Sequence, residues 1–286
     1  MKCSRRRFLQ SSLVGASAVL SGSVASLAMA EEKTKRKKLP VGLELWSVRD
    51  SCQKDLPGVL KAVAEMGYDG VEFAHSFYGH DPESIRKMLD ENGLKSCGMH
   101  TTVPFLQGKR LDKMIQIHKI LGTPFIIVAS LPRKTMHSVE GILKTAKWFN
   151  EVAEKLKPHG LKIGYHSHAG DFAKLGDSTP WELIGDNTSE DVILQLDTSN
   201  CLAGGGDPYA MLKKYPGRTL TVHLKEYGGP KGAVLGEGEV KWNKVFDLCE
   251  TIGGTQWYVI EEESRKGKAA LKAVGRALKN FKRLHG

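Results

Sequence analysis

Tyr165-His166-Ser167-His168 ends an apolar run with two imidazole side chains, and three later runs end on metal-type ligands in the same manner. These runs end in Leu196-Asp197, Val222-His223-Leu224-Lys225 and Val259-Ile260-Glu261. Short apolar runs separated by helical patterns are typical of parallel strands, whose carboxyl ends meet at one rim. The pattern therefore predicts a barrel of alternating strands and helices with a metal site at its C-terminal mouth.

The same alternation continues along the rest of the chain. Strand-like runs are expected at residues 41–46, 71–73, 94–100, 124–129, 161–166, 192–196, 219–224 and 257–260. Helical patterns are expected at residues 56–66, 83–92, 111–121, 139–156, 208–215, 242–251 and 268–284. Alternation of strand and helix requires a parallel sheet, so the predicted fold is α/β, a single (β/α)8 TIM barrel over residues 41–286. An open, doubly wound sheet is the alternative.

Strand periodicity places the ligand-type side chains on one face of each strand. On strands five to eight these side chains are His166 and His168, Gln195 and Asp197, His223 and Lys225, and Glu261. Each has a simpler explanation, since a lone histidine in a strand is often a core residue and a strand-end aspartate often caps the next helix. Their convergence on one rim favours a site for one divalent ion.

The predicted ligands of this ion are His166, Asp197, His223 and Glu261. Such a mixed nitrogen and oxygen site suits manganese or zinc first, with cobalt, iron or magnesium as alternatives. Glu262 and Glu263 are competing carboxylates. Because Glu262 points away from Glu261 and Glu263 lies beyond the strand, both are expected to be surface groups.

The first 30 residues have the features of an export signal. Ser4-Arg5-Arg6-Arg7-Phe8-Leu9 places a twin arginine before a moderately apolar run, which ends in Ala28-Met29-Ala30. A small residue on each side of Met29 is typical of a cleavage site. The run is short and rich in Ser, Gly and Ala, which argues against the alternative of a membrane anchor. The expected location is therefore exported and periplasmic, with cleavage after Ala30.

The charge of the chain is concentrated near its start. Of the formal net charge of +10, the signal carries +4 and residues 31–38 carry +3. The basic run Lys33-Thr34-Lys35-Arg36-Lys37-Lys38 lies between the cleavage site and the first strand, so residues 31–40 are interpreted as a solvated leader and not as a nucleic-acid patch. Four cysteines follow the signal without a CxxC pair, and they are expected to be core residues.

Five motifs resemble those of the sugar phosphate isomerase/epimerase group of xylose isomerase-like barrels. They are Val41-Gly42-Leu43-Glu44-Leu45-Trp46-Ser47-Val48-Arg49, Gly67-Tyr68-Asp69-Gly70-Val71-Glu72, Gly164-Tyr165-His166-Ser167-His168, Leu196-Asp197-Thr198-Ser199-Asn200 and Val222-His223-Leu224-Lys225. The resemblance implies a metal held by Glu, Asp, His and Glu from strands five to eight. Asp197, His223 and Glu261 match the last three, and His166 stands in place of the first glutamate.

This departure at His166 bears on the reaction. Epimerases of the group are understood to use two glutamates on opposite faces of the substrate, and here one of them is missing. Glu261 alone, beside a metal that polarises a ketone, suffices for enolisation followed by elimination. The expected function is a divalent-metal-dependent lyase or dehydratase-type enzyme acting on a sugar or keto-sugar. A sugar isomerase or epimerase is the alternative, because Asp171 would replace the missing carboxylate.

Further roles follow from the same interpretation. Glu261 and His168 are the catalytic candidates, and the expected contacts to substrate are His100, Lys225, Arg49 and Trp46. The expected partner is a small-molecule carbohydrate, with no nucleic acid and no membrane anchor after cleavage, and a homo-oligomer is left open. The same superfamily includes abasic-site endonucleases, which carry a histidine three residues after the aspartate of strand six. This chain has Asn200 at that position, so a nuclease function is disfavoured. The alternative from another class is a non-catalytic carbohydrate-binding barrel.

Overall fold

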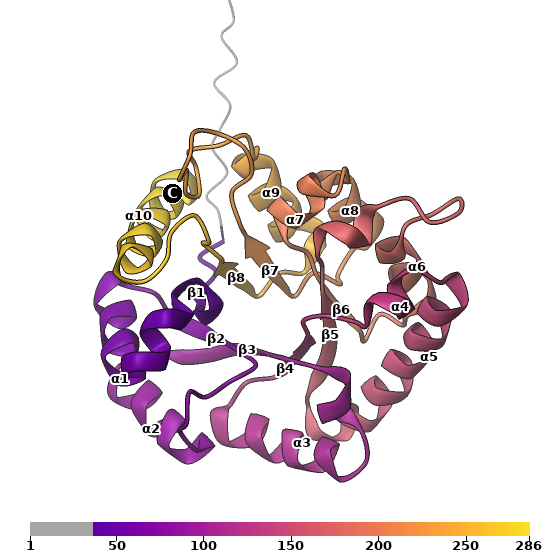
Figure 1. The fold of residues 1–286 in the computed structure, drawn as a ribbon, viewed down its shortest axis with the longest axis horizontal. Coiled ribbons are helices and arrows are strands. Elements are labelled where there is room, and N and C mark those ends of the chain that lie inside the picture. Colours follow the sequence, from indigo (N-terminus) through magenta and orange to yellow (C-terminus); the bar gives the residue numbers. More distant parts are fainter. Residues whose placement is uncertain (1–36) are drawn as a thin grey trace, which may run out of the picture. The chain divides into compact units, whose positions relative to one another are not determined.

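The computed structural model describes residues 37–286, so the predicted signal and most of the leader lie outside the described part of the chain. Within it, eight strands alternate with helices (Figure 1). The strands are β1 (Val41–Glu44), β2 (Gly70–Ala74), β3 (Lys95–Thr101), β4 (Phe125–Val128), β5 (Lys162–His166), β6 (Ile193–Gln195), β7 (Thr221–Leu224) and β8 (Trp257–Ile260). All of their pairings are parallel.

The sheet closes on itself at the seam between β6 and β7. Its order is β6-β5-β4-β3-β2-β1-β8-β7, so that the first strand pairs with the last. At the seam an isolated parallel bridge joins Asp197 to His223, and the His223 amide donates to the Leu196 carbonyl at 2.9 Å. The predicted (β/α)8 barrel is confirmed, and two of the predicted metal ligands form its closing contact.

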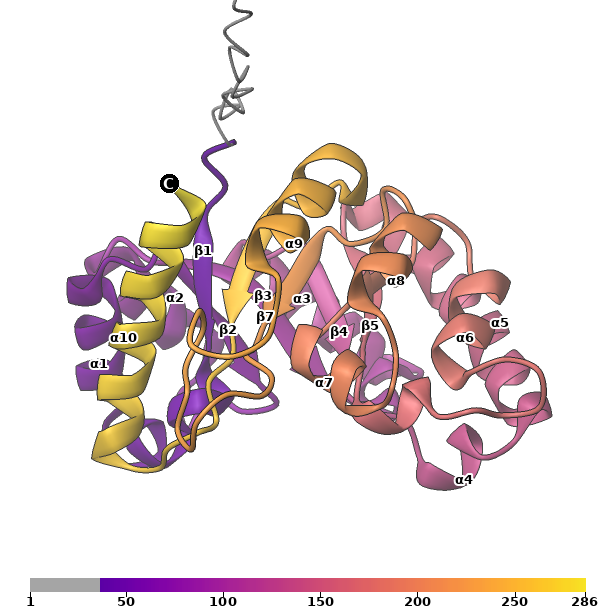
Figure 2. The same ribbon diagram turned by 90° about the horizontal axis from the view of Figure 1, so that it is seen from above.

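Helices surround the strands. The longer ones are α1 (Arg49–Met66), α2 (Pro82–Glu91), α3 (Lys109–Leu121), α5 (Val139–Leu156), α6 (Pro180–Asn187) and α10 (Lys268–His285). The shorter ones are α4 (Arg133–Met136), α7 (Thr198–Ala203), α8 (Pro208–Lys214) and α9 (Trp242–Leu248). Single turns at η1 (Leu45–Val48), η2 (Val103–Leu106), η3 (Lys157–His159), η4 (Ala169–Phe172) and η5 (Cys249–Gly253) complete the connections. Seen side-on, α1 and α10 flank one side of the barrel, and α5 and α6 flank the other (Figure 2).

Several helices differ from the sequence prediction: the short helices α4 and α7 were not predicted, and two longer helices also depart from it. Helix α6 was not predicted, although Thr179 caps it through the Glu182 amide and Pro180 occupies its first turn. Helix α1 begins at Arg49 instead of residue 56, and it breaks at Asp55, whose φ is −158°. The Asp55 carboxylate accepts from the Gly58 amide at 2.9 Å, so it caps the second half of α1, which is the predicted helix.

The barrel interior is apolar at one end and polar at the other. Phe125, Ile127 and Ile193 form a separate buried cluster, against which Leu220 and Trp257 pack. Phe125, Ile193 and Trp257 are the first residues of their strands, so this cluster lies toward the bottom of the barrel. Buried glutamates, histidines and a glutamine lie nearer the carboxyl ends. The scaffold thus supports a polar site on an apolar base.

Other expectations concern the cysteines and the membrane. Cys52, Cys97, Cys201 and Cys249 are buried and free, as predicted for core residues. Among residues 37–286, no helix combines the length and the apolar character that crossing a bilayer requires.

Candidate metal and catalytic site at the barrel mouth

The predicted metal ligands come together at the carboxyl ends of four strands. His166 is the last residue of β5, His223 lies in β7, and Asp197 and Glu261 follow β6 and β8. All four side chains are buried, and one ligand atom from each lies within 4.8 Å of the others. Two overlapping groups of neighbouring ligand atoms involve His100, His166 and His223, and Glu44, Glu72, His100 and His223.

Asp197 has one carboxylate oxygen engaged and one free. Its Oδ1 accepts from the Asn200 amide at 2.7 Å and caps α7, as the simpler interpretation of a strand-end aspartate predicted. Its Oδ2 is buried and has no hydrogen-bond partner among the described residues. Burial raises the pKa of Asp197 to about 7, although Lys225 opposes the shift. A buried oxygen without a hydrogen-bond partner lowers the stability of the fold by about 1–3 kcal/mol. Coordination of a metal ion by Oδ2 would supply the missing partner.

His223 lies between two carboxylates. Its Nδ1 is 2.7 Å from Glu261 Oε2, and its Nε2 is 2.5 Å from Glu72 Oε2. Burial alone would lower the pKa of His223, but Glu261 and Glu72 raise it to about 10. The ring therefore donates from both nitrogens here, and a cation on the Glu261 side would replace the Nδ1 proton.

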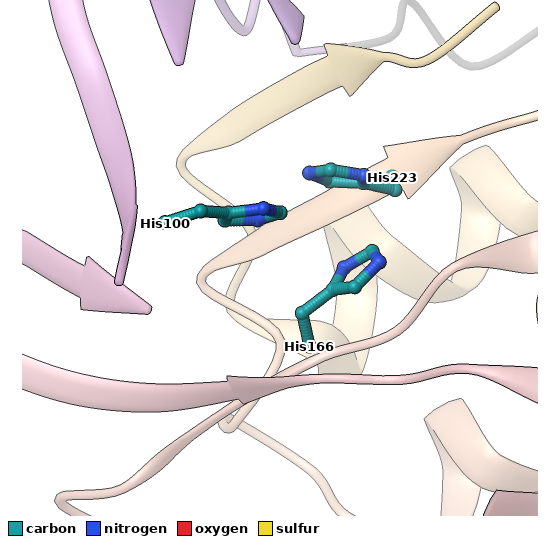
Figure 3. Close-up of side chains that lie close together, drawn as sticks. All are labelled: His100, His166 and His223. Atoms are coloured by element: carbon teal, nitrogen blue, oxygen red, sulfur yellow. The ribbon is translucent and has the colours of Figure 1, made fainter. Parts of the chain in front are cut away.

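His166 presents a neutral ring. Its Nδ1 is 3.0 Å from Gln195 Oε1, an acceptor, so Nδ1 carries the proton and Nε2 keeps its lone pair. Burial, together with His223 and His100, holds the pKa of His166 well below the ordinary value. The rings of His100, His166 and His223 point toward one another from β3, β5 and β7 (Figure 3). A neutral imidazole is the form that binds metals.

Glu261 is held in its ionised form. Burial would raise its pKa, but the hydrogen bond with His223 and the charge of Lys225 hold it well below the ordinary value. Lys225 Nζ lies 2.8 Å from Glu261 Oε1 and also bonds Glu263. An ionised carboxylate can serve both as a metal ligand and as a proton acceptor.

Three buried polar residues of this site were not predicted as site residues. Gln195 accepts from His100 and donates to Glu72, at 2.9 and 3.0 Å. Glu44 is fully buried, and burial and the neighbouring Glu72 raise its pKa well above the ordinary value. The sequence held two signals: the spacing of two between Gln195 and Asp197 placed both on one strand face, and Glu44 and Glu72 each lie in one of the family-like motifs.

A pocket of about 160 Å³ opens above this network. Its lining residues come from the strand ends and the loops that follow: Glu44, Trp46, Ala74, His75, His100, Ala129, Ser130, His166, His168 and Glu261. Both predicted catalytic residues, Glu261 and His168, thus line one pocket. The ring of His168 lies 5.0 Å from that of His166 and nearly perpendicular to it.

The predicted substrate contacts fall into two groups. His100 and Trp46 line the pocket, and the Trp46 side chain is 43% exposed. Arg49 covers one face of the Trp46 ring at 4.2 Å, and Lys225 lies beside Glu261. In the part of the chain that the structure describes, Arg49 and Lys225 do not line this pocket.

The expectation for Glu262 is corrected, and the expectation for Glu263 holds. Glu262 is buried and not a surface group, because its amide donates to Ser47 and its side chain accepts from the Ser264 amide. Glu263 is exposed as predicted, yet it accepts from Trp46 Nε1 at 3.0 Å and bonds Lys225.

Asp171 does not join the ligand group. Its Oδ2 accepts from the Tyr165 hydroxyl at 2.9 Å and from the His168 amide at 2.8 Å. This carboxylate therefore shapes the loop after β5. The structure gives no support to the idea that it replaces the missing family glutamate.

Known proteins resemble the chain in sequence and in fold. An inosose dehydratase of Glaesserella parasuis serovar 5 is 25% identical over 248 residues, which cover 71% of this chain and 82% of that protein. A sugar phosphate isomerase/epimerase of Parabacteroides distasonis has a TM-score of 0.73 at 22% identity, covering 87% of this chain and 97% of its own. The IOLI protein, solved with a zinc atom bound, has a TM-score of 0.66 at 14% identity, covering 86% and 98%. The sequence model of the xylose isomerase-like TIM barrel matches residues 60–284, and the chain belongs to that family.

Proposed function

We propose that this protein is a divalent-metal-dependent lyase of the dehydratase type, acting on a keto-sugar or a related cyclic ketone. The observation that carries the proposal is the buried, unpartnered Oδ2 of Asp197 beside three other ligand groups, two of which, His166 and Glu261, line the pocket. The similarity to inosose dehydratases supports the reaction class.

The residues present fit a metal. His166 with its free Nε2 lone pair, Asp197 Oδ2, His223 and Glu261 would hold it, and this donor set favours manganese or zinc. A zinc atom in the similarly folded IOLI protein agrees with that choice. When bound, the ion would polarise the substrate carbonyl and acidify the adjacent C–H bond.

Glu261 performs the proton transfers in this proposal. Its carboxylate takes the proton from the carbon next to the carbonyl, and the electron pair of that C–H bond forms the new carbon–carbon double bond. The C–O bond at the next carbon breaks, and its oxygen leaves as water after Glu261 returns the proton to it. One residue therefore suffices, which accords with His166 in place of a second glutamate.

The pocket lining indicates a neutral substrate. Among the described residues that line it there is no lysine or arginine, so nothing there would clamp a phosphate. Trp46 offers an aromatic wall, and His100 and His168 offer ring nitrogens to substrate oxygens. Lys225 and Arg49 act from the rim, Lys225 by neutralising Glu261 and Arg49 by supporting Trp46. A neutral substrate agrees with the export that we infer from Arg5-Arg6 and Ala28-Met29-Ala30.

Incubation of the metal-loaded protein with inosose and with oxidised and unoxidised sugars in deuterated water tests the proposal. The expected product is lighter than the substrate by one water, and Asp197→Ala, in which we expect the metal to be lost, should not form it. A product that has lost no water but carries deuterium at carbon would replace the lyase by an isomerase or epimerase. Binding without exchange or conversion would favour a carbohydrate-binding barrel.

A further inference from the structure

Glu72 is a fully buried carboxylate in β2, and it contacts His223 at Nε2. Its Oε2 is 2.5 Å from His223 Nε2 and 3.3 Å from His100 Nε2. The other nitrogen of His223, Nδ1, faces Glu261. Glu72 does not line the pocket among the described residues, so its contact with the site runs through the two histidines.

The surroundings of Glu72 fix its position. Gln195 Nε2 donates to both of its oxygens, at 3.0 and 3.2 Å, and also contacts Thr221. On β3, Gly98 leaves the space that the carboxylate fills. A Cβ at this position would lie 2.1 Å from Glu72 Oε1, so a larger residue could be accommodated only if the carboxylate left its present position.

We propose that Glu72, held by Gln195 and accommodated by Gly98, is the positioning residue of the metal ligand His223. The proposal rests on the proposed metal site. The carboxylate keeps the proton on Nε2, which leaves Nδ1 for the ion, and it fixes the orientation of the ring. The negative charge of Glu72 also makes Nδ1 of His223 a stronger electron-pair donor to the ion. An ordinary buried ion pair would stabilise the barrel without affecting metal affinity.

Competition with a chromophoric chelator measures the affinity for zinc and for manganese in the purified protein. Glu72→Gln keeps the shape and an acceptor oxygen but removes the charge, and it should weaken binding about 10-fold. Glu72→Ala removes both, and it should weaken binding by up to about 100-fold. Circular dichroism reports whether each variant is folded. If Glu72→Ala does not fold, the metal affinity of Glu72→Gln alone tests the proposal.

Glu250→Gln is the matched control. Glu250 also pairs with a histidine, His285, at 2.7 Å, but it lies in η5, at the amino end of β8 and far from the mouth. The same chemical change there should leave both affinities within about 2-fold, since neither residue contacts the ligand group.

Gly98→Ala tests the positioning by a second route. The added methyl group should displace Glu72 and reproduce most of the loss of affinity seen in Glu72→Ala. In the Glu72→Ala background the same change should have little further effect, because the group on which it acts is gone. Independent, additive losses would contradict the proposal.

The outcomes separate this inference from the proposed function. If the wild type binds no metal, or if Asp197→Ala binds as tightly as the wild type, the metal site is wrong and this proposal falls with it. If Asp197→Ala loses the metal but Glu72→Gln and Gly98→Ala keep wild-type affinity, only the role of Glu72 is overturned. The visible spectrum of the cobalt-loaded protein gives an independent readout, and it should change in Glu72→Gln.

Discussion

The Glu261 carboxylate contacts His223 and Lys225, and it also lines the pocket. This arrangement keeps Glu261 ionised and leaves it facing the substrate space. Replacing it by glutamine preserves its size but removes the proton acceptor. We expect Glu261→Gln to retain much of the substrate affinity and to lower kcat by a factor of about 10²–10⁴, measured by steady-state kinetics with metal content determined in parallel.

Glu262→Gln is the control for this prediction. Its side chain is not among the described residues that line the pocket, and it accepts from the Ser264 amide, a role that glutamine can also fill. The same substitution one residue away should change kcat less than about 2-fold. If Glu261→Gln with full metal content turned over substrate at the wild-type rate, Glu261 would not be the base.

His118 provides a pH dependence remote from the site. This buried histidine of α3 donates through Nδ1 to the Met114 carbonyl, and burial lowers its pKa from 6.5 to about 4. As the pH falls below 6.5, His118 becomes protonated in the unfolded chain but stays neutral in the folded chain. The free energy of unfolding therefore decreases between pH 6.5 and about 4. The loss between pH 7 and pH 5 should be about 2 kcal/mol.

Urea unfolding at pH 7, 6 and 5 measures this effect. His118→Asn keeps a donor for the Met114 carbonyl but does not titrate, so the variant should lose about 2 kcal/mol less than the wild type over this range. Identical pH dependence in the two proteins would show that His118 titrates normally in the folded state.

The sequence predicted which strand-end residues would form the metal site, but it did not predict the buried residues that hold them, such as Glu72. His166, Asp197, His223 and Glu261 ended apolar runs, and strand periodicity alone placed them on one rim. Glu72 sits within an apolar strand, where sequence spacing does not say which strand it faces. Its contacts with His223 depend on a separation of 151 residues, which only the closed barrel brings together.

At the scale of elements, the seam between β6 and β7 is the weakest part of the sheet. A few backbone bonds cross it, such as that from the Leu194 amide to the Arg218 carbonyl. The buried guanidinium of Arg218 adds bonds to the carbonyls of Val192 and Gly185 and to the Thr188 hydroxyl. Lysine cannot span these acceptors. Arg218→Lys should therefore lower the free energy of unfolding by about 2–4 kcal/mol, measured by urea denaturation.

Arg276→Lys is the control, because it makes the same substitution at an exposed arginine. Arg276→Lys should cost less than about 0.5 kcal/mol, because surface contacts of this kind contribute little. Equal stability of Arg218→Lys and the wild type would show that the seam does not depend on this guanidinium.

The elements themselves were predictable in number and order for the strands, and less so for the helices. All eight predicted strands are present, because each is a short apolar run between turn signals. Helix α6 was missed because its eight residues include glycine and only a few apolar positions. The early start of α1 was hidden by Asp55 and Pro57, which mark a helix start in sequence but here mark a break.

At the scale of the whole molecule, the closure of the barrel bears on the export that we propose. Strand β1 pairs with β8, so the sheet is complete only when nearly all of the chain is available. A pathway that carries folded proteins, as twin-arginine export is generally understood to do, would suit such a barrel. It would also allow metal to be loaded before the protein leaves the cytoplasm.

We therefore expect Arg5→Lys combined with Arg6→Lys to hold the uncleaved precursor in the cytoplasm, while the wild type appears in the periplasm and begins at Glu31. Arg7→Lys makes the same change just outside the twin arginine, and it should leave export unaffected. Cell fractionation and N-terminal sequencing measure both outcomes. Recovery of an uncleaved wild-type chain in the membrane fraction would instead make residues 1–30 an anchor, and the barrel would then work while tethered to the bilayer.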